Sequence, residues 1–300
     1  MQRYEIVLPS VNTRNYPKPI TTLVIAPEVI RASTGVMLFS HGWGWSRLRY
    51  LDFMSAVAEQ HDLLCLASEY RQSGLDFDPV TGVGYDVPYD GSFLQVFDVL
   101  NSLRQILPMY PQLNRRRIFH YGGSQGGHIA LLSAIFAPNT FTAVYSSSGM
   151  TSLDQPKIDL CGRCFSPAEL SARDVCAHAA MIQCPLFLEH GTADENVNCE
   201  QHAGRLDKRL QNLYKTYTLK YYAGGGHSLA PAISKKEAFL AMLPALLATP
   251  DRAGPDDFQS GSQVLLPCGE SSLQIDWSKA PGSTELFSWV CPPGADKTAL

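Results

Sequence analysis

Gly122-Gly123-Ser124-Gln125-Gly126 is the stretch that decides the fold of this 300-residue chain. Residues 117–121 before it are mainly apolar and predict a buried strand, and residues 127–137 after it have a helical pattern that ends before a proline. A strand, a sharp turn and a helix are the setting of a nucleophile elbow, in which glycines let the turn close around a serine at its tip. We therefore predict that Ser124 is an exposed nucleophile with a strained backbone.

A catalytic serine needs a general base, and the base needs an acid to orient it. Asp194 follows a predicted buried strand over residues 185–191, at the carboxyl end where α/β folds place functional loops. His227 lies on a glycine-rich loop after a second predicted strand, residues 216–222. We predict that Ser124, Asp194 and His227 form a catalytic triad in this chain order.

Three other side chains compete for these roles. Glu195 is the neighbour of Asp194, but one step along a turn usually directs a side chain elsewhere. His128 lies one helical turn after Ser124 and is expected to pack along its own helix, and His190 at the end of a strand is expected to order the acid loop.

The stretch His41-Gly42-Trp43-Gly44-Trp45 follows a predicted strand over residues 35–40 and predicts an oxyanion hole. The expected donors are the backbone N–H groups of Trp43 and Gln125, each worth about 3 kcal/mol to a transition state. The two tryptophans suggest an apolar wall beside the acyl group, although they could simply cap the core. We expect Trp45 to contact substrate, and Tyr70 as well, because it lies on a long loop, residues 69–90, and long loops are often functional.

Predicted strands alternate with predicted helices along residues 1–248, which indicates an α/β fold with a mostly parallel, doubly wound sheet. Two opening strands, within residues 4–8 and 21–26, are expected to pair antiparallel at the sheet edge. Residues 149–184 show little sustained periodicity apart from residues 167–180, and they are interpreted as an irregular lid insertion. After a proline- and glycine-rich linker, residues 249–300 predict a small β-rich extension packed on the main domain, with a partner-binding or oligomerising module as the alternative.

The composition excludes several classes of protein. The net charge is −4 and no basic patch stands out, so we expect no nucleic-acid partner. No apolar run approaches ~20 residues, and the first residues have no signal-peptide core, so we expect a cytoplasmic protein that does not span a membrane. A homo-oligomer is left open.

Eight cysteines are many for a cytosolic chain. Cys161 and Cys164 form a C-x-x-C pair and, with Cys176 and His178, could hold zinc in the lid. The close spacing of Cys176 and His178 is cramped for a tetrahedral site. We therefore expect plain thiols, with a disulfide or redox pair as the second interpretation, and no metal or cofactor.

These motifs resemble the α/β-hydrolase superfamily over roughly residues 20–248. The resemblance rests on His41-Gly42, Gly122-Gly123-Ser124-Gln125-Gly126-Gly127, His190-Gly191-Thr192-Ala193-Asp194 and Gly226-His227. Shorter strings are similar to acetyl-xylan-type deacetylases and, over residues 91–143, to bacterial hydrolases related to the prolyl oligopeptidase group. The chain departs from the exopeptidases of that group, because no paired-glutamate motif for a peptide amine and no preceding propeller are apparent.

The resemblance implies a serine hydrolase that forms an acyl-enzyme. We expect a carboxylic ester as the substrate, and a peptidase or amidase with the same residues as the close alternative. A non-catalytic binding protein of the same fold is the alternative from another class, but a binding protein need not keep all three triad residues. The expected partner is a small ester or a short peptide.

Overall fold

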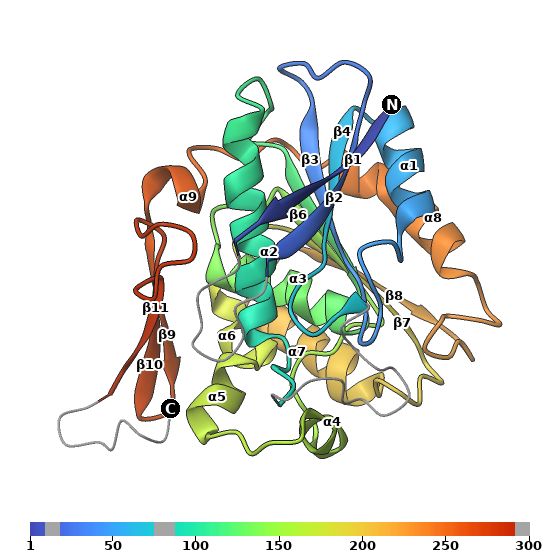
Figure 1. Cartoon of the computed structure of the whole chain (residues 1–300). Helices are drawn as coiled ribbons and strands as arrows, with labels where there is room; N and C mark the ends of the chain where they lie inside the picture. Colours follow the sequence, from blue (N-terminus) through green and yellow to red (C-terminus); the bar gives the residue numbers. More distant parts are fainter. Residues whose placement is uncertain (10–18, 75–87, 292–300) are drawn as a thin grey trace.

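The fold is that of a computed structural model, which describes residues 1–9, 19–74 and 88–291. Eight strands form the main sheet in the order β1-β2-β4-β3-β5-β6-β7-β8 (Figure 1). In chain order these strands are β1 (Gln2–Leu8), β2 (Ile20–Ala26), β3 (Gly35–Ser40), β4 (Leu63–Ser68), β5 (Ile118–Gly123), β6 (Ala143–Ser147), β7 (Leu186–Gly191) and β8 (Tyr217–Tyr222). β1 and β4 pair antiparallel with β2, and all the other neighbours are parallel, which confirms the predicted sheet and its antiparallel edge.

The central strands are hydrophobic on both faces because helices cover both faces of the sheet. Every residue of β3, β4 and β5 is buried. Helices α1 (Leu51–Gln60) and α8 (Lys235–Leu247) contribute to the core on one face, and α2 (Phe93–Ile106), α3 (Gln125–Phe136) and α7 (Arg205–Asn212) to the core on the other (Figure 1). This two-sided cover leaves the carboxyl ends of the parallel strands as the edge at which loops can gather.

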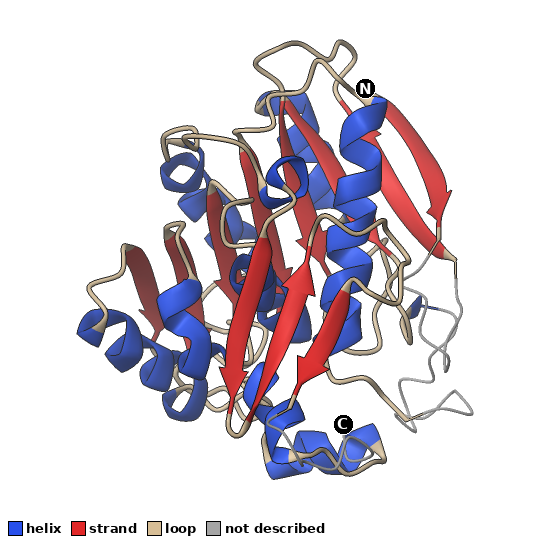
Figure 2. Ribbon diagram, turned by 90° about the vertical axis from the view of Figure 1, so that its left-hand side faces the viewer, coloured by secondary structure: helices blue, strands red, loops and turns tan. Residues whose placement is uncertain are grey.

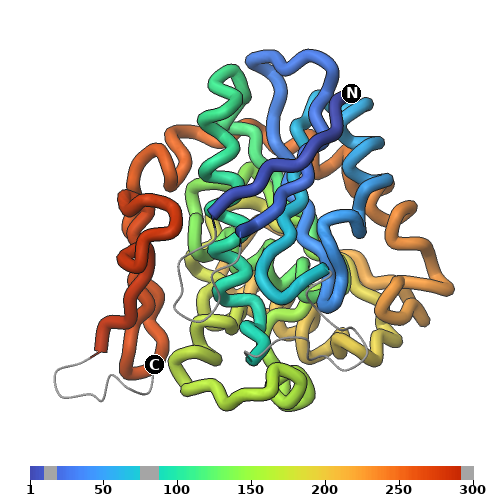
Figure 3. Tube along the Cα trace, in the orientation of Figure 1, coloured from blue at the N-terminus to red at the C-terminus, as the bar shows by residue number. Residues whose placement is uncertain are grey.

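The segment predicted as an irregular lid contains short helices instead. They are α4 (Gln155–Cys161), α5 (Pro167–Ala172) and α6 (Val175–His178), and they lie beyond the lower end of the main sheet in the chain trace (Figure 3). Asp154, Ser166 and Asp174 each accept a backbone N–H at a helix start. Local capping therefore defines the starts of these helices, the longest of which has seven residues.

The C-terminal extension forms a three-stranded antiparallel sheet of β9 (Gln263–Cys268), β10 (Ser271–Asp276) and β11 (Phe287–Val290), preceded by α9 (Asp257–Ser260). Figure 2 shows this sheet in front of the helices that cover the main sheet. The Phe287 ring stacks on Phe97 of α2, with 4.6 Å between ring centroids, and the buried Trp277 donates its indole N–H to the Phe136 carbonyl at 2.8 Å. The small sheet thus shares the core of the main domain.

Across the three described ranges, no helix combines the length and apolar character needed to cross a membrane. The apolar positions within residues 47–61 predict a helix there, but α1 starts only at Leu51, because residues 47–50 make turns instead. The strand β10 was not predicted, since its apolar residues, Leu273 and Ile275, alternate with polar ones over a short stretch only.

Candidate active site

The predicted nucleophile lies at a strained turn. Ser124 joins the end of β5 to the start of α3 with φ +57°, a conformation that costs a non-glycine residue free energy. The turn needs glycine on both sides: a Cβ at Gly122 would stand 2.0 Å from the Gly126 carbonyl oxygen, and one at Gly126 would stand 1.9 Å from that of Ser40. The glycines of the motif are therefore fixed by close approach of the backbone.

The structure brings the three predicted triad residues to one place. The His227 Nδ1 lies 2.8 Å from Asp194 Oδ2, and Ser124 and His227 line the same cavity of about 520 Å³. Among the described residues no hydrogen bond joins Ser124 Oγ to the His227 ring. Catalytic hydrogen bonds are often loose without substrate and tighten in the Michaelis complex.

Asp194 is held on all sides. Its Oδ1 accepts the backbone N–H groups of Asn196 and Val197, both at 2.9 Å, and its Oδ2 lies 3.2 Å from His190 Nε2 in addition to His227. Burial alone would raise the pKa of Asp194, but hydrogen bonds from His190 and His227 hold this pKa well below its ordinary value. The carboxylate is thus ionised and fixed, which is what orienting an imidazole requires.

The three side chains weighed against Asp194 and His227 take other positions and partners. Glu195 is exposed, next to the buried Asp194. His128 is fully buried, with Nδ1 3.1 Å from Ser92 Oγ and Nε2 2.7 Å from the Arg173 carbonyl, so it is a satisfied packing residue. His190 contacts both the Val197 carbonyl, at 2.8 Å, and Asp194, so it orders the acid loop.

The loop predicted to form the oxyanion hole contacts the nucleophile turn. A Cβ at Gly42 would lie 3.3 Å from Ser124 Cβ, which places the following residue, Trp43, beside the nucleophile. Gln125 is the first residue of α3, where a helix leaves its backbone N–H without an acceptor inside the helix. Trp43 and Gln125 both line the cavity, as the predicted pair of donors would have to.

Of the two predicted substrate contacts, only Trp45 lies in the cavity wall, with 53% of its surface exposed. Tyr70 is fully buried behind the loop, where its ring stacks on His41 at 4.1 Å and its hydroxyl donates to the His41 carbonyl at 2.6 Å. The expectation that Tyr70 contacts substrate is corrected accordingly: it supports the oxyanion loop from behind. Residues 75–87 of its predicted long loop lie outside the described residues.

Tyr89 is a site residue that sequence reasoning missed. Its hydroxyl donates to Gln125 Oε1 at 2.7 Å, and its ring stacks on Trp43 with 4.0 Å between centroids. It therefore contacts both residues of the predicted oxyanion hole. No motif marks this tyrosine, because its partners are remote in sequence; the length of the 69–90 loop was the only signal.

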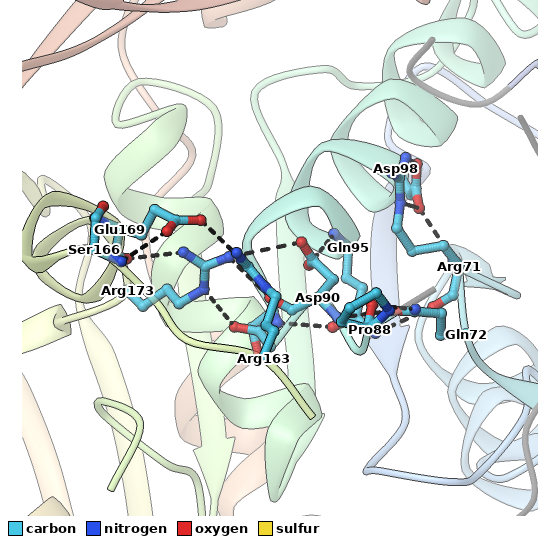
Figure 4. A network of polar contacts seen from close by, with 12 residues as sticks. Arg71, Gln72, Pro88, Asp90, Gln95, Asp98, Arg163, Ser166, Glu169 and Arg173 are labelled. Carbon is cyan, nitrogen blue, oxygen red and sulfur yellow. Dashed lines mark hydrogen bonds and ion pairs between the residues drawn. The ribbon is translucent and has the colours of Figure 1, made fainter. Parts of the chain in front are cut away.

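A buried polar network fixes the segment that carries Tyr89 (Figure 4). Arg173 donates to the carbonyls of Asp90, at 2.8 Å, and Gly91, at 3.0 Å, while Gln72 binds Pro88 O and the Asp90 N–H. Arg71 forms an ion pair with Asp98 of α2 at 2.7 Å. Arg173 of the lid and Gln72 of the main domain thus hold the segment that carries Tyr89 from two directions.

The cysteine motif contributes no structural staple in the described ranges. Cys161 is buried and Cys164 is exposed, and both are free thiols, as are the other six cysteines. No group of three or more possible ligands that could hold a metal ion occurs among the residues that the structure describes. The His178 Nε2 instead lies 3.0 Å from the Ser171 carbonyl oxygen.

Comparison with known proteins identifies the family. A model of the prolyl oligopeptidase family matches residues 95–243, which include all three predicted triad residues. This chain is an α/β-hydrolase of the prolyl oligopeptidase family. The superfamily expected from the sequence is thereby confirmed.

Relatives of known sequence or structure are distant. An uncharacterized peptidase of Bacillus subtilis, YtmA, is 26% identical over 151 residues, which cover 46% of this chain and 58% of that protein. The acylaminoacyl peptidase of Pyrococcus horikoshii matches with 16% identity and a TM-score of 0.64, over 85% of this chain and 43% of its own. A puromycin-hydrolyzing peptidase of Mycobacterium tuberculosis matches with 20% identity and a TM-score of 0.64, over 83% and 40%. The chain thus spans under two thirds of these relatives, and the structural matches show the fold alone.

Proposed function

We propose that this family member is a serine peptidase that hydrolyses peptide bonds through an acyl-enzyme. The observation that carries the proposal is the 2.8 Å contact of His227 with Asp194 in the cavity that holds the strained Ser124. The choice of an amide over an ester is supported by the family, and by relatives whose names describe peptidases. No feature specific to esters favours the carboxylesterase predicted from sequence.

In the proposed reaction Ser124 Oγ attacks the peptide carbonyl while His227 Nε2 accepts its proton. The tetrahedral oxyanion accepts hydrogen bonds from the N–H groups of Trp43 and Gln125. His227 then gives the proton to the leaving amine, and water repeats the sequence on the acyl-enzyme. Asp194 keeps Nδ1 of His227 protonated, so that Nε2 faces the serine, and it stabilises the imidazolium.

The test is a direct comparison of matched acyl groups. Peptidyl p-nitroanilides and the corresponding p-nitrophenyl esters should both be hydrolysed, with Ser124→Ala as the blank for each. Because activated esters react readily with any good serine nucleophile, the amide result decides. Hydrolysis of the esters with no measurable turnover of any anilide or peptide would refute the peptidase proposal and restore the esterase.

The partner and the cellular compartment of the protein are proposals as well. We propose a short peptide as the partner and the cytoplasm as the compartment in which the thiols stay reduced. Fractionation of cells with an antibody against the chain would test the compartment, and enrichment in an exported fraction would contradict it.

A further inference from the structure

Among the described residues, positively charged side chains line the cavity that holds Ser124, and no carboxylate does. Its three cations are Arg49, Lys157 and Lys235. They come from three separate elements: Arg49 precedes α1, Lys157 lies on the lid helix α4, and Lys235 is the first residue of α8. The chain as a whole is acidic, with a net charge of −4, so this local excess of positive charge is not a property of the composition.

None of the three cations forms an ion pair within the part of the chain that the structure describes. Lys157 Nζ donates to the Asn196 carbonyl at 3.1 Å, which uses one of its three protons. Arg49 lies over the Trp45 ring, 4.2 Å from its centroid, and the ring leaves the edge of the guanidinium available. Lys157 and Arg49 are thus held in place with donors to spare.

Lys235 faces charges on three neighbouring segments. The carboxyls of Glu189, on β7, and Asp194, after β7, attract it, while Arg49 repels it. Asp194 is committed to His227 and His190. Glu189 is buried, and this burial raises the pKa of its carboxyl and favours its neutral form. Lys235 and Arg49 are therefore like charges near each other, and neither has an ion-paired counterion among the residues that the structure describes.

A substrate can supply this counterion. We propose that the substrate carries a carboxylate close to the scissile bond, and that Arg49, Lys157 and Lys235 bind this carboxylate in the cavity beside Ser124. The inference rests on the proposed hydrolase function and specifies its substrate class. The carboxylate belongs either to the carboxyl terminus of a short peptide or to an acidic group beside the bond that is cleaved.

The test compares pairs of substrates that differ only in charge. On the acyl side the pair is succinyl-alanine p-nitroanilide and its succinamyl isostere, with p-nitrophenyl esters of the same two acyl groups. On the leaving-group side, one pair is a peptide with a free carboxyl terminus and the same peptide with a terminal amide. A second pair is an amidated peptide that carries either Glu or Gln beside the bond that is cleaved. These arms distinguish the two sources of the carboxylate. We expect the wild type to prefer the anionic member of at least one pair about tenfold in kcat/KM, and the preference to fall with salt.

Lys157→Met and Lys235→Met should each reduce this preference severalfold, mainly by raising KM for the anionic substrate, and Lys157→Glu should reverse it. The matched control is Lys236→Met, which removes an exposed cation that does not line the cavity and should keep the preference. Labelling of Ser124 by a fluorophosphonate shows that each variant is folded and active.

Equal rates for every pair in the wild type, or a preference unchanged in both lysine variants, would overturn the inference. Failure of the peptidase proposal is a separate result: the ester pairs still measure the charge preference if no anilide or peptide is cleaved.

Discussion

The Tyr89 hydroxyl donates to Gln125 Oε1 at 2.7 Å, and the same tyrosine ring stacks on Trp43. One side chain thus contacts both residues whose N–H groups are proposed to stabilise the oxyanion. Because a preorganised hole depends on the position of its donors to a fraction of an ångström, Tyr89 is a positioning residue for the site.

Tyr89→Phe removes the hydrogen bond and retains the stack on Trp43. We expect kcat to fall about three- to tenfold, the worth of one neutral hydrogen bond, with little change in KM, because the loss is felt where the oxyanion develops. Steady-state kinetics on the best anilide or ester measures it. Tyr214→Phe is the control, since Tyr214 is 96% exposed. A loss confined to KM would show that Tyr89 contacts the substrate and does not position the hole.

Ser124→Ala and His227→Ala should each lower kcat by a factor on the order of 10⁴ to 10⁶, and the double variant should lose little more, because triad members act as a unit. Thermal unfolding should be unchanged or slightly improved for Ser124→Ala. His61→Ala, at the end of α1 away from the cavity, is the control. Additive losses in the double variant would show that the two side chains do not work together.

Asp194→Asn should cost on the order of 10⁴ in kcat, because the amide favours the wrong imidazole tautomer. Glu195→Gln should change kcat less than about twofold, as an exposed substitution does. The kcat of each variant, measured under saturating substrate, decides whether Asp194 or Glu195 orients His227. The reverse ranking would move the orienting acid by one position.

Acid should weaken the fold partly through Asp194, whose pKa is depressed by His190 and His227. A depressed carboxyl stabilises the folded state above its unfolded pKa of about 3.9, and this stabilisation disappears as the pH falls through the lower folded pKa. Urea unfolding should therefore show that the free-energy gap between wild type and Asp194→Asn narrows from pH 5 to pH 2. A constant gap over this range would show that Asp194 is not specially stabilised as an anion.

The proposed preference for anionic substrates should depend on pH through Lys235. Burial lowers the pKa of Lys235 to about 8, although Glu189 and Asp194 oppose this shift. The lysine is charged below that pH and loses its charge as the pH rises through it. The ratio of kcat/KM for anionic and neutral substrates should fall between pH 7 and pH 9, and Lys235→Arg should remove this fall. A ratio that is flat in the wild type would show that Lys235 does not bind the anion.

The sheet and the positions of the three proposed triad residues at strand ends were predictable because their signals are local. The strand β3 ends where predicted, since a six-residue run buried on both faces leaves little choice of boundary. The elbow was predictable because its glycines are required by backbone contact. Ser124, Asp194 and His227 follow the ends of β5, β7 and β8, so their order was predictable from the order of the strands. The lid helices were not predicted as separate elements. Ser166 and Glu169 form a capping box, but the periodicity of residues 167–180 runs across α5 and α6 and does not show where either helix begins or ends.

The positions of Tyr70 and Tyr89 could not be predicted. Both belong to the segment between β4 and α2, and the sequence says only that this segment is long. Tyr70 packs on His41, 29 residues earlier, while Tyr89 reaches Gln125, 36 residues later. Such pairings are set by how the chain returns across the sheet, so a tyrosine that contacts substrate and one that supports a loop look alike in sequence.

The indole of Trp277 reaches the Phe136 carbonyl, in the last turn of the helix whose first turn follows Ser124. Helix ends leave such carbonyls without partners, and here the C-terminal sheet supplies one. The tail is therefore part of the scaffold of the active site and not an appendage that an engineer can trim. A chain cut after α8 would uncover Phe97 and Phe136, and a fusion partner placed at that point would separate the helix of the nucleophile from the residue that anchors its far end.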